Sequence, residues 1–132
     1  MCDSTRLPVA GQRREVRKQA ARLRSLGVPS PKLFAPPYGA YNRKTLKVLR
    51  RLKLLMVLWS TDTRDYLRPG VKAIVKRALR GAKPGAIILL HDGGGDRAQT
   101  VQALPAIVRG LRNRGYRLVT VPRMMLRDPP RG

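Results

Sequence analysis

The sequence has 132 residues, the length of one ordinary domain, and 42% of them are hydrophobic. The hydrophobic residues fall in discrete runs, which excludes a disordered chain. The formal net charge is +22, from 29 Lys and Arg against 7 Asp and Glu. A positive field of this size favours polyanionic partners such as nucleic acid, anionic cell-wall polymers and acidic lipid surfaces.

The basic residues are spread along the chain over several predicted amphipathic helices. Aromatic residues make up only 5% of the sequence and do not interleave with the charges. Binding of single-stranded nucleic acid requires such interleaved aromatic residues, on which the bases stack. We therefore interpret the charge as the solvated faces of helices, with non-specific polyanion binding as the alternative. The single cysteine, Cys2, excludes an intrachain disulfide and a cysteine-based metal site. We expect neither a transmembrane helix nor a signal peptide.

The first predicted elements are a helix and a short strand. A basic amphipathic helix is expected over residues 12–26, with Val16 and Leu23 on one face. Gly27 stands where a left-handed C-terminal cap belongs. The strand follows at residues 32–35.

A second helix and a longer strand come next. Asn42 is a favourable N-cap for a helix that runs to about Leu52, with Leu46 and Leu49 facing inward. Residues 54–59 then form a continuous apolar run. Such a run is typical of a strand that is buried on both faces, as in a parallel sheet.

The second half of the chain repeats this alternation. Pro69 predicts the first turn of a third helix, which ends near Arg80. Residues 86–90 form a second fully apolar strand. A fourth helix is expected over residues 97–113 and a last strand over residues 116–121.

Helices that alternate with apolar strands predict an α/β fold with a parallel sheet. In such folds, functional residues gather on the loops at the C-terminal ends of the strands. Three loops qualify, at residues 35–39, 60–66 and 91–96. They hold the only histidine, His91, and four of the seven acidic residues: Asp62, Asp65, Asp92 and Asp96.

Each of these loops carries a motif that resembles one in polysaccharide deacetylases. The family's Arg-Pro-Pro-Tyr-Gly loop is similar to FAPPYG at residues 34–39. Its Asp-x-x-Asp-Trp segment is similar to WSTDTRDY at residues 59–66, and its Leu-x-His segment to LLHD at residues 89–92. Because the three occur in the family's order, the chain resembles the C-terminal portion of a NodB-homology domain of carbohydrate esterase family four.

The resemblance implies a partial, distorted (β/α) barrel whose first strands are missing. It also implies a hydrolase that removes acetyl groups, on nitrogen or oxygen, from glycans such as chitin and peptidoglycan. In the family, an Asp and two His hold a divalent metal such as zinc, and a second Asp is the catalytic base. A further His, on the far side of the substrate, protonates the leaving amine.

Carried over to this sequence, the family pattern assigns roles to single residues. His91 would be the general acid, and Asp65 would orient and tune it. The backbone N–H of Tyr38 would help to stabilise the oxyanion. The residues in contact with the substrate would be Leu89, beside the acetyl methyl group, Tyr66 and Pro37.

Each of these residues also has a structural interpretation. His91 could be a loop histidine that bonds nearby backbone, and the proline-rich segment could be an ordinary turn. Asp62 and Asp65 could be turn or helix-cap residues, and for Asp62 we prefer that interpretation.

Two of the family's motifs have no counterpart in the sequence. The Thr-Phe-Asp-Asp-Gly segment, which supplies the base and a metal ligand, is absent. So is the metal-binding histidine pair, whose expected place lies just before or within residues 1–3. Ala35 replaces the Arg that pairs with the base, and Tyr66 replaces a Trp. We therefore expect no metal or other cofactor in this chain and no activity from it alone.

The resemblance also sets the expected domain boundaries. Residues 1–122 would form the C-terminal portion of the deacetylase domain, and residues 123–132 a disordered tail. The missing strands would leave a sheet edge uncovered, so we predict poor solubility or self-association. Family members act mostly outside the cytoplasm, which leaves the localisation of this chain open.

A dinucleotide-binding site is a second alternative. Residues 93–98 fit the pattern G-x-G-x-x-A between a predicted strand and a predicted helix. Against this interpretation, Asp92 and Asp96 would flank the pyrophosphate. No acidic residue follows about twenty residues later, where the contact to the ribose requires one.

Overall fold

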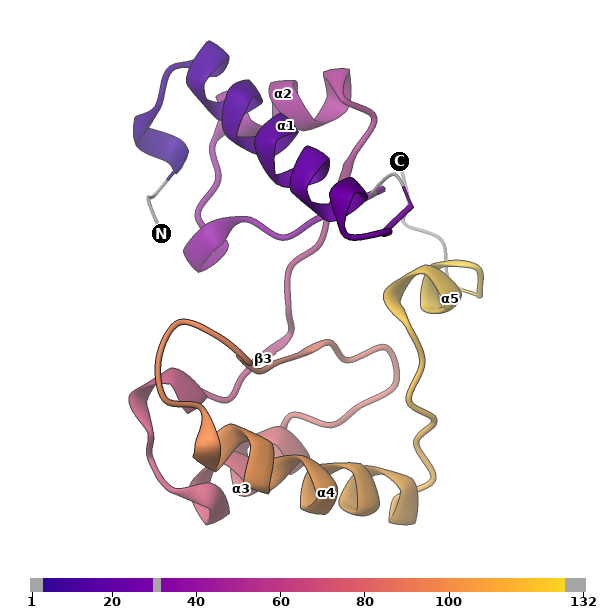
Figure 1. The fold of residues 1–132 in the computed structure, drawn as a ribbon. Coiled ribbons are helices and arrows are strands. Elements are labelled where there is room, and N and C mark those ends of the chain that lie inside the picture. Colours follow the sequence, from indigo (N-terminus) through magenta and orange to yellow (C-terminus); the bar gives the residue numbers. More distant parts are fainter. Residues whose placement is uncertain (1–3, 30–31, 128–132) are drawn as a thin grey trace. The chain divides into compact units, whose positions relative to one another are not determined.

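The computed structural model describes residues 4–29 and 32–127. Cys2, residues 30–31 and residues 128–132 of the expected tail lie outside this part. The chain divides into two compact units, Met1–Leu58 (unit 1) and Trp59–Gly132 (unit 2). Each unit holds a pair of short parallel strands and two main helices (Figure 1).

The main helix of unit 1 is α1 (Val9–Ser25), which follows a short 3-10 helix η1 (Ser4–Arg6). It begins three residues before the predicted start, directly after Pro8, because proline's missing N–H costs nothing at a helix N-terminus. The predicted cap at Gly27 is confirmed: Gly27 has a φ of +82°, and the N–H of Val28 donates back to the carbonyl of Leu23.

Helix α2 (Arg43–Arg51) has the N-cap that the sequence predicts. The Asn42 Oδ1 accepts from the N–H of Thr45 at 3.0 Å, and the Thr45 Oγ1 accepts from the N–H of Asn42 at 3.3 Å. The inward orientation of Leu46 was wrong, because this side chain is 44% exposed, whereas Leu49 is buried as expected.

Helices α1 and α2 pack together over the core of unit 1, which Val16, Val48 and Leu49 form. Beside this core lie the parallel strands β1 (Leu33–Phe34) and β2 (Leu55–Met56). The 3-10 helix η2 (Pro37–Gly39) follows β1.

Unit 2 contains the helices and strands of the second half of the chain. In chain order these are β3 (Thr61–Asp62), η3 (Asp65–Leu67), α3 (Val71–Arg80), β4 (Ile88–Leu89), α4 (Ala98–Asn113) and α5 (Val121–Met125). Strands β3 and β4 pair in parallel. Helices α3 and α4 pack through a core of small and branched side chains: Ile74, Ala78, Ala103, Ile107 and Leu111.

Three sequence-based expectations for unit 2 were wrong. Residues 116–120 form no strand, because no neighbouring strand among the described residues pairs with them. The predicted loop 60–66 contains strand β3, which forms because β4 lies beside it. Helix α3 begins at Val71, since Gly70, with a φ of +96°, cannot belong to the helix.

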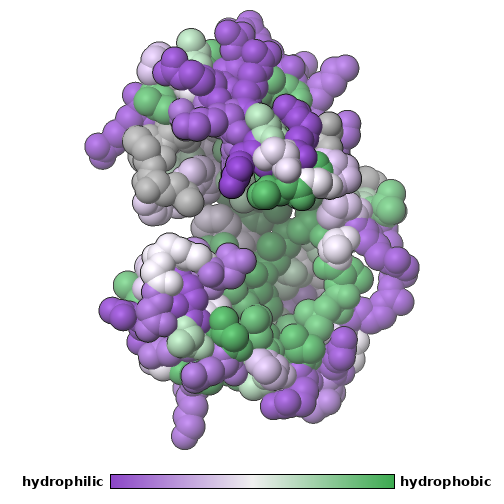
Figure 2. All heavy atoms as spheres, viewed as in Figure 1, coloured by the Kyte–Doolittle hydropathy of each residue, from purple (hydrophilic) through white to green (hydrophobic). Residues whose placement is uncertain are grey.

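The described residues build two separate pairs of parallel strands, so the expected partial barrel stays a prediction. The two apolar runs are not buried on both faces: Leu55 and Leu58 are exposed, and residues 86–90 are half-buried. In unit 2, β4, α4 and residues 115–119 line a hollow of about 790 Å³. Figure 2 shows apolar residues at the surface of this unit.

Helix α5 ends at Met125, three residues past the expected domain end at 122. The domain boundary itself stays a prediction. Within the described ranges, no helix combines the length and apolarity that crossing a membrane requires.

The close approach of β3 to the end of α3 gives a testable prediction. A Cβ atom at Gly81 would lie 2.1 Å from the Oγ1 and 2.7 Å from the Cβ of Thr61. Because the whole Thr61 side chain would have to move, we expect Gly81→Ala to lower the free energy of unfolding by about 1–3 kcal/mol, measured by urea denaturation.

The matched control is Gly93→Ala, because a Cβ at Gly93 meets no atom within 4 Å and its φ is not left-handed. We expect this control to change the free energy of unfolding by less than about 0.5 kcal/mol. Equal stability of both variants would show that β3 and α3 do not approach as described.

Candidate active site

The centre of the site is the carboxylate of Asp65, at the start of η3. This residue is 1% exposed although it is charged at neutral pH. The turn before it is fixed by Thr63, whose Oγ1 donates to the carbonyl of Leu89 at 2.9 Å. The Arg77 Nη1 of α3 donates to the carbonyl of Thr63 at 3.0 Å. The turn that leads into Asp65 is thus held by contacts to both β4 and α3.

His91 follows β4 and contacts Asp65 through two different groups. Its backbone N–H donates to the Asp65 Oδ2 at 2.7 Å, and its Nδ1 lies 2.7 Å from the Oδ1. Because an ionised carboxylate only accepts hydrogen bonds, Nδ1 carries the proton of this pair. The imidazole is therefore fixed in orientation, with Nε2 as the second ring nitrogen available for chemistry. The side chain of His91 is 35% exposed.

The same carboxylate accepts a third hydrogen bond from α4. The Thr100 Oγ1 donates to the Asp65 Oδ2 at 2.8 Å. Burial by itself would raise the pKa of Asp65, but the hydrogen bonds from the His91 side chain and backbone and from Thr100 outweigh it. The pKa of Asp65 consequently lies below its ordinary value of 3.8, so the site keeps a buried negative charge beside His91.

Tyr66 and Leu89 lie next to this pair. The Tyr66 ring meets the His91 ring edge-on, with centroids 5.5 Å apart and an interplanar angle of 82°. Leu89 is half-buried in β4, where it pairs with Asp62 of β3. The structure therefore brings four of the six predicted site residues together in unit 2.

The other two predicted site residues, Pro37 and Tyr38, belong to η2 of unit 1. Tyr38 has a φ of +57°, an uncommon backbone conformation for a residue other than glycine, and its side chain is 72% exposed. Strained residues of this kind cluster at functional sites, which is compatible with the predicted role of its N–H.

The loop after His91 is closed by the side chain of Arg97. Its guanidinium donates to the carbonyls of Gly93 and Gly94 at 3.0 and 3.1 Å, and to that of Tyr66 at 3.4 Å. At the start of α4, the N–H of Ala98 donates to the Asp96 Oδ1 at 3.0 Å. A carboxylate thus stands where a pyrophosphate would bind, which disfavours the dinucleotide interpretation.

The remaining acidic residues of the three loops do not join the site. The Asp62 Oδ1 accepts from the N–H of Arg64, which makes it the turn residue we preferred. Asp92 is exposed, and Asp96 lies 4.0 Å from Arg68 at the surface. Among residues 4–29 and 32–127, no three His, Cys, Asp or Glu side chains are placed to hold a metal ion.

Comparison with known proteins gives the family. The family model described as polysaccharide deacetylase matches residues 3–57. Over 100 residues, the chain is 46% identical to a peptidoglycan-N-acetylglucosamine deacetylase of Bacillus cereus, covering 74% of this chain and 47% of the relative. It is 39% identical to a chitooligosaccharide deacetylase of Azorhizobium caulinodans over 67% of this chain and 48% of the relative.

Solved structures agree with this assignment. A family 4 carbohydrate esterase from Streptomyces lividans, in complex with acetate, matches with a TM-score of 0.80 at 32% identity, over 86% of this chain and 57% of that one. The chain belongs to the polysaccharide deacetylase family. Its α/β fold matches the part of the Streptomyces esterase that it covers. The chain spans about half the length of the curated deacetylases it matches.

Sequence reasoning missed two residues that hold the candidate site together. Thr100 lies 35 residues from Asp65, and neither its type nor its spacing marks it among the other residues of α4. Gln99 accepts from the N–H of Gly70 at 2.7 Å and so fixes the segment after η3. The sequence signal for both is only their place in the first turn of a helix that follows a glycine-rich loop.

The lowered pKa of Asp65 predicts how stability depends on pH. The folded state favours the ionised carboxylate of Asp65. The ionised group therefore stabilises the fold when the pH is above 3.8, its ordinary pKa, and this stabilisation is lost as the pH falls below that value. We expect Asp65→Asn to lower stability at about pH 7 and to flatten the loss of stability in acid, measured by thermal unfolding across pH.

Thr100→Val tests the third hydrogen bond of this carboxylate. Because the Asp65 Oδ2 would lose a donor, we expect a loss of about 1–3 kcal/mol at neutral pH. Asp92→Asn is the control for both variants, since Asp92 is exposed. An acid transition that is the same in Asp65→Asn and in the unchanged chain would contradict the ionised, buried state of Asp65.

Proposed function

We propose that this chain provides the general-acid side of a glycan deacetylase, a hydrolase of carbon–nitrogen bonds other than peptide bonds. The observation that carries the proposal is the pairing of buried Asp65 with His91 through two hydrogen bonds of 2.7 Å. The names of the relatives point to N-acetylglucosamine units of peptidoglycan or of chitooligosaccharides as the substrate.

In the proposed reaction, a base from additional polypeptide takes a proton from water as the water oxygen bonds to the acetamide carbon, and the carbon–nitrogen bond then breaks. His91 gives the Nε2 proton to the leaving nitrogen, so that the products are acetate and the free amine of the sugar. Asp65 keeps Nδ1 protonated and stabilises the positive imidazole before the transfer. The described residues do not fit a metal site, so no step here passes through a metal.

The remaining predicted site residues bind the substrate in this proposal. Leu89 contacts the acetyl methyl group, while Tyr66 and Pro37 border the sugar. The N–H of Tyr38 donates to the oxyanion that forms when water adds. The proposal includes the expected domain, a partial (β/α) barrel of the family's type that takes in residues 1–122.

We expect the 132-residue chain to be inactive by itself. His91 is the only histidine of the sequence, and its Nδ1 is bonded to Asp65. A metal site with two histidines therefore has to come from additional polypeptide. Added zinc should not produce acetate release from chitooligosaccharides by this chain.

Activity can be tested in a chimera in which this chain replaces the matching residues of the Bacillus cereus deacetylase. We expect His91→Gln to lower kcat for acetate release by about 10²–10⁴-fold, because the general acid is lost, with an unchanged circular dichroism spectrum. The chimera is made with Ala35 and with Ala35→Arg, since the family has an Arg at this position.

Asp92→Asn is the matched control, because Asp92 lies in the same loop as His91 but has no described role in the site. We expect this variant to keep the rate within about twofold. A chimera that deacetylates equally well with Gln at position 91 would refute the proposed role of His91.

The hollow of unit 2 predicts self-association of the isolated chain. Leu118 and Val119 line it and are 48% and 43% exposed. Since a second copy can cover these apolar side chains, we expect sedimentation velocity to show association that grows with concentration. Leu118→Lys should weaken it, and Leu26→Lys, at an exposed position of unit 1, should not. A monomer at all concentrations would contradict this prediction.

A further inference from the structure

Unit 1 carries an unusual concentration of positive charge on its two helices. Glu15 is the single acidic side chain among residues 4–29 and 32–58. We call the exposed cations of α1 and α2 the basic helix face. Its members are Arg13, Arg14, Arg17, Lys18, Arg22 and Arg24 of α1 and Arg43, Lys44, Lys47, Arg50 and Arg51 of α2.

The cations of this face stand next to one another along each helix. Arg14, Lys18 and Arg22 follow at intervals of four residues, which places them on one side of α1. The same interval recurs in α2. Like charges at this spacing repel each other and destabilise the helix that carries them. The arrangement is therefore unfavourable unless an anion neutralises it.

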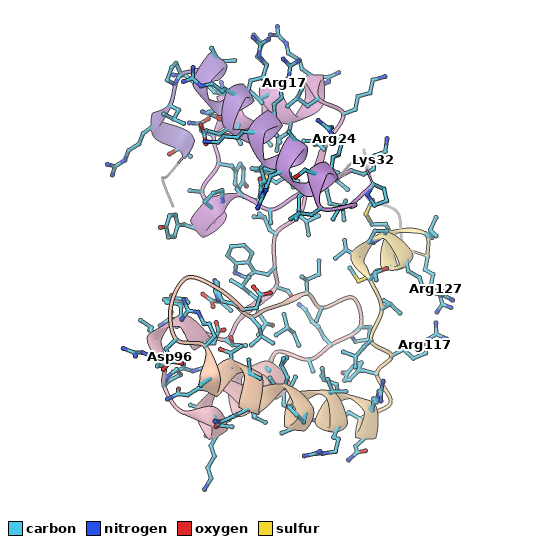
Figure 3. The ribbon with its side chains drawn as sticks, in the orientation of Figure 1. Arg17, Arg24, Lys32, Asp96, Arg117 and Arg127 are labelled. Atoms are coloured by element: carbon cyan, nitrogen blue, oxygen red, sulfur yellow. The ribbon has the colours of Figure 1, made fainter. Side chains whose placement is uncertain are left out.

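The protein itself supplies little neutralisation. Among the described residues, no side chain of the basic helix face donates a hydrogen bond or forms an ion pair. In unit 2, by contrast, Arg77, Arg97 and Arg114 donate to backbone carbonyls. Figure 2 shows hydrophilic residues over α1 and α2, and Figure 3 marks Arg17 and Arg24 along α1.

The start of α2 adds to this imbalance. Arg43 and Lys44 lie in its first turn, which contains no acidic residue. The N-terminus of a helix carries a partial positive charge and is stabilised by anions, so two cations there are unfavourable. A bound anion would relieve both effects.

We propose that the basic helix face of unit 1 binds a linear polyanion without bases, of the polyol-phosphate type. Neither α1 nor α2 contains an aromatic residue on which bases could stack, which disfavours single-stranded nucleic acid. An acidic membrane is disfavoured because the apolar side chains of both helices pack inward, with Leu46 the exposed exception among the large ones.

The test measures binding of fluorescently labelled poly(glycerol phosphate) to the 132-residue chain by anisotropy, at several salt concentrations. The first variant is Arg14→Glu, Lys18→Glu, Arg22→Glu. We expect it to lower the affinity by at least about tenfold at 0.1 M salt and to reduce the slope of log affinity against log salt by about three.

The matched control reverses three cations of unit 2 with the same spacing: Lys72→Glu, Lys76→Glu, Arg80→Glu. Both triple variants change the net charge equally, and all six positions are exposed. We expect the control to lower the affinity by less than about threefold. Equal losses in the two variants would overturn the proposal, because binding would then follow only the total charge.

Two further measurements keep the result decisive. A neutral variant, Arg14→Gln, Lys18→Gln, Arg22→Gln, should show about half the effect with an unchanged circular dichroism spectrum, which separates lost binding from lost folding. Single-stranded DNA of equal charge should bind no more tightly than the polyol phosphate. Binding of DNA more than tenfold tighter would overturn the choice of a ligand without bases. None of these measurements requires deacetylase activity.

Discussion

The buried carboxylate of Asp65 is the interaction on which the candidate site depends. It accepts three hydrogen bonds, from the backbone and the ring of His91 and from Thr100, and so joins η3, the loop after β4 and α4. A buried charge is costly unless several donors surround it, so these three segments have to come together in one way. The geometry that stabilises the charge also presents Nε2 of His91.

The packing of α3 and α4 makes this convergence possible. Ala78 and Ala103 are fully buried between the helices, and Gly110 of α4 approaches Leu79 closely, so that a Cβ there would lie 2.8 Å from the leucine methyl groups. Small side chains allow the two helices to lie near each other. Thr100, at the start of α4, is thereby held close to η3, while β4 brings His91 from the other side.

The two units contribute different chemistry to the proposed function. Unit 2 contains a buried, ionised carboxylate paired with His91, while unit 1 has a row of cations with Glu15 as its single described acid. In these proposals the Asp65–His91 pair supplies the proton to the leaving nitrogen, and the basic helix face binds a polyanion.

The sequence by itself determined the family, the pairing of Asp65 with His91 and the helix ends at Asn42 and Gly27, because ordered motifs and caps are local signals. The tertiary structure alone decided the rest. Thr100 is recognisable only when α4 lies beside η3, since its contact spans 35 residues. Strands exist only where a neighbour pairs with them, so β3 formed within a predicted loop and residues 116–120 formed no strand although Tyr, Val and Thr are common in strands.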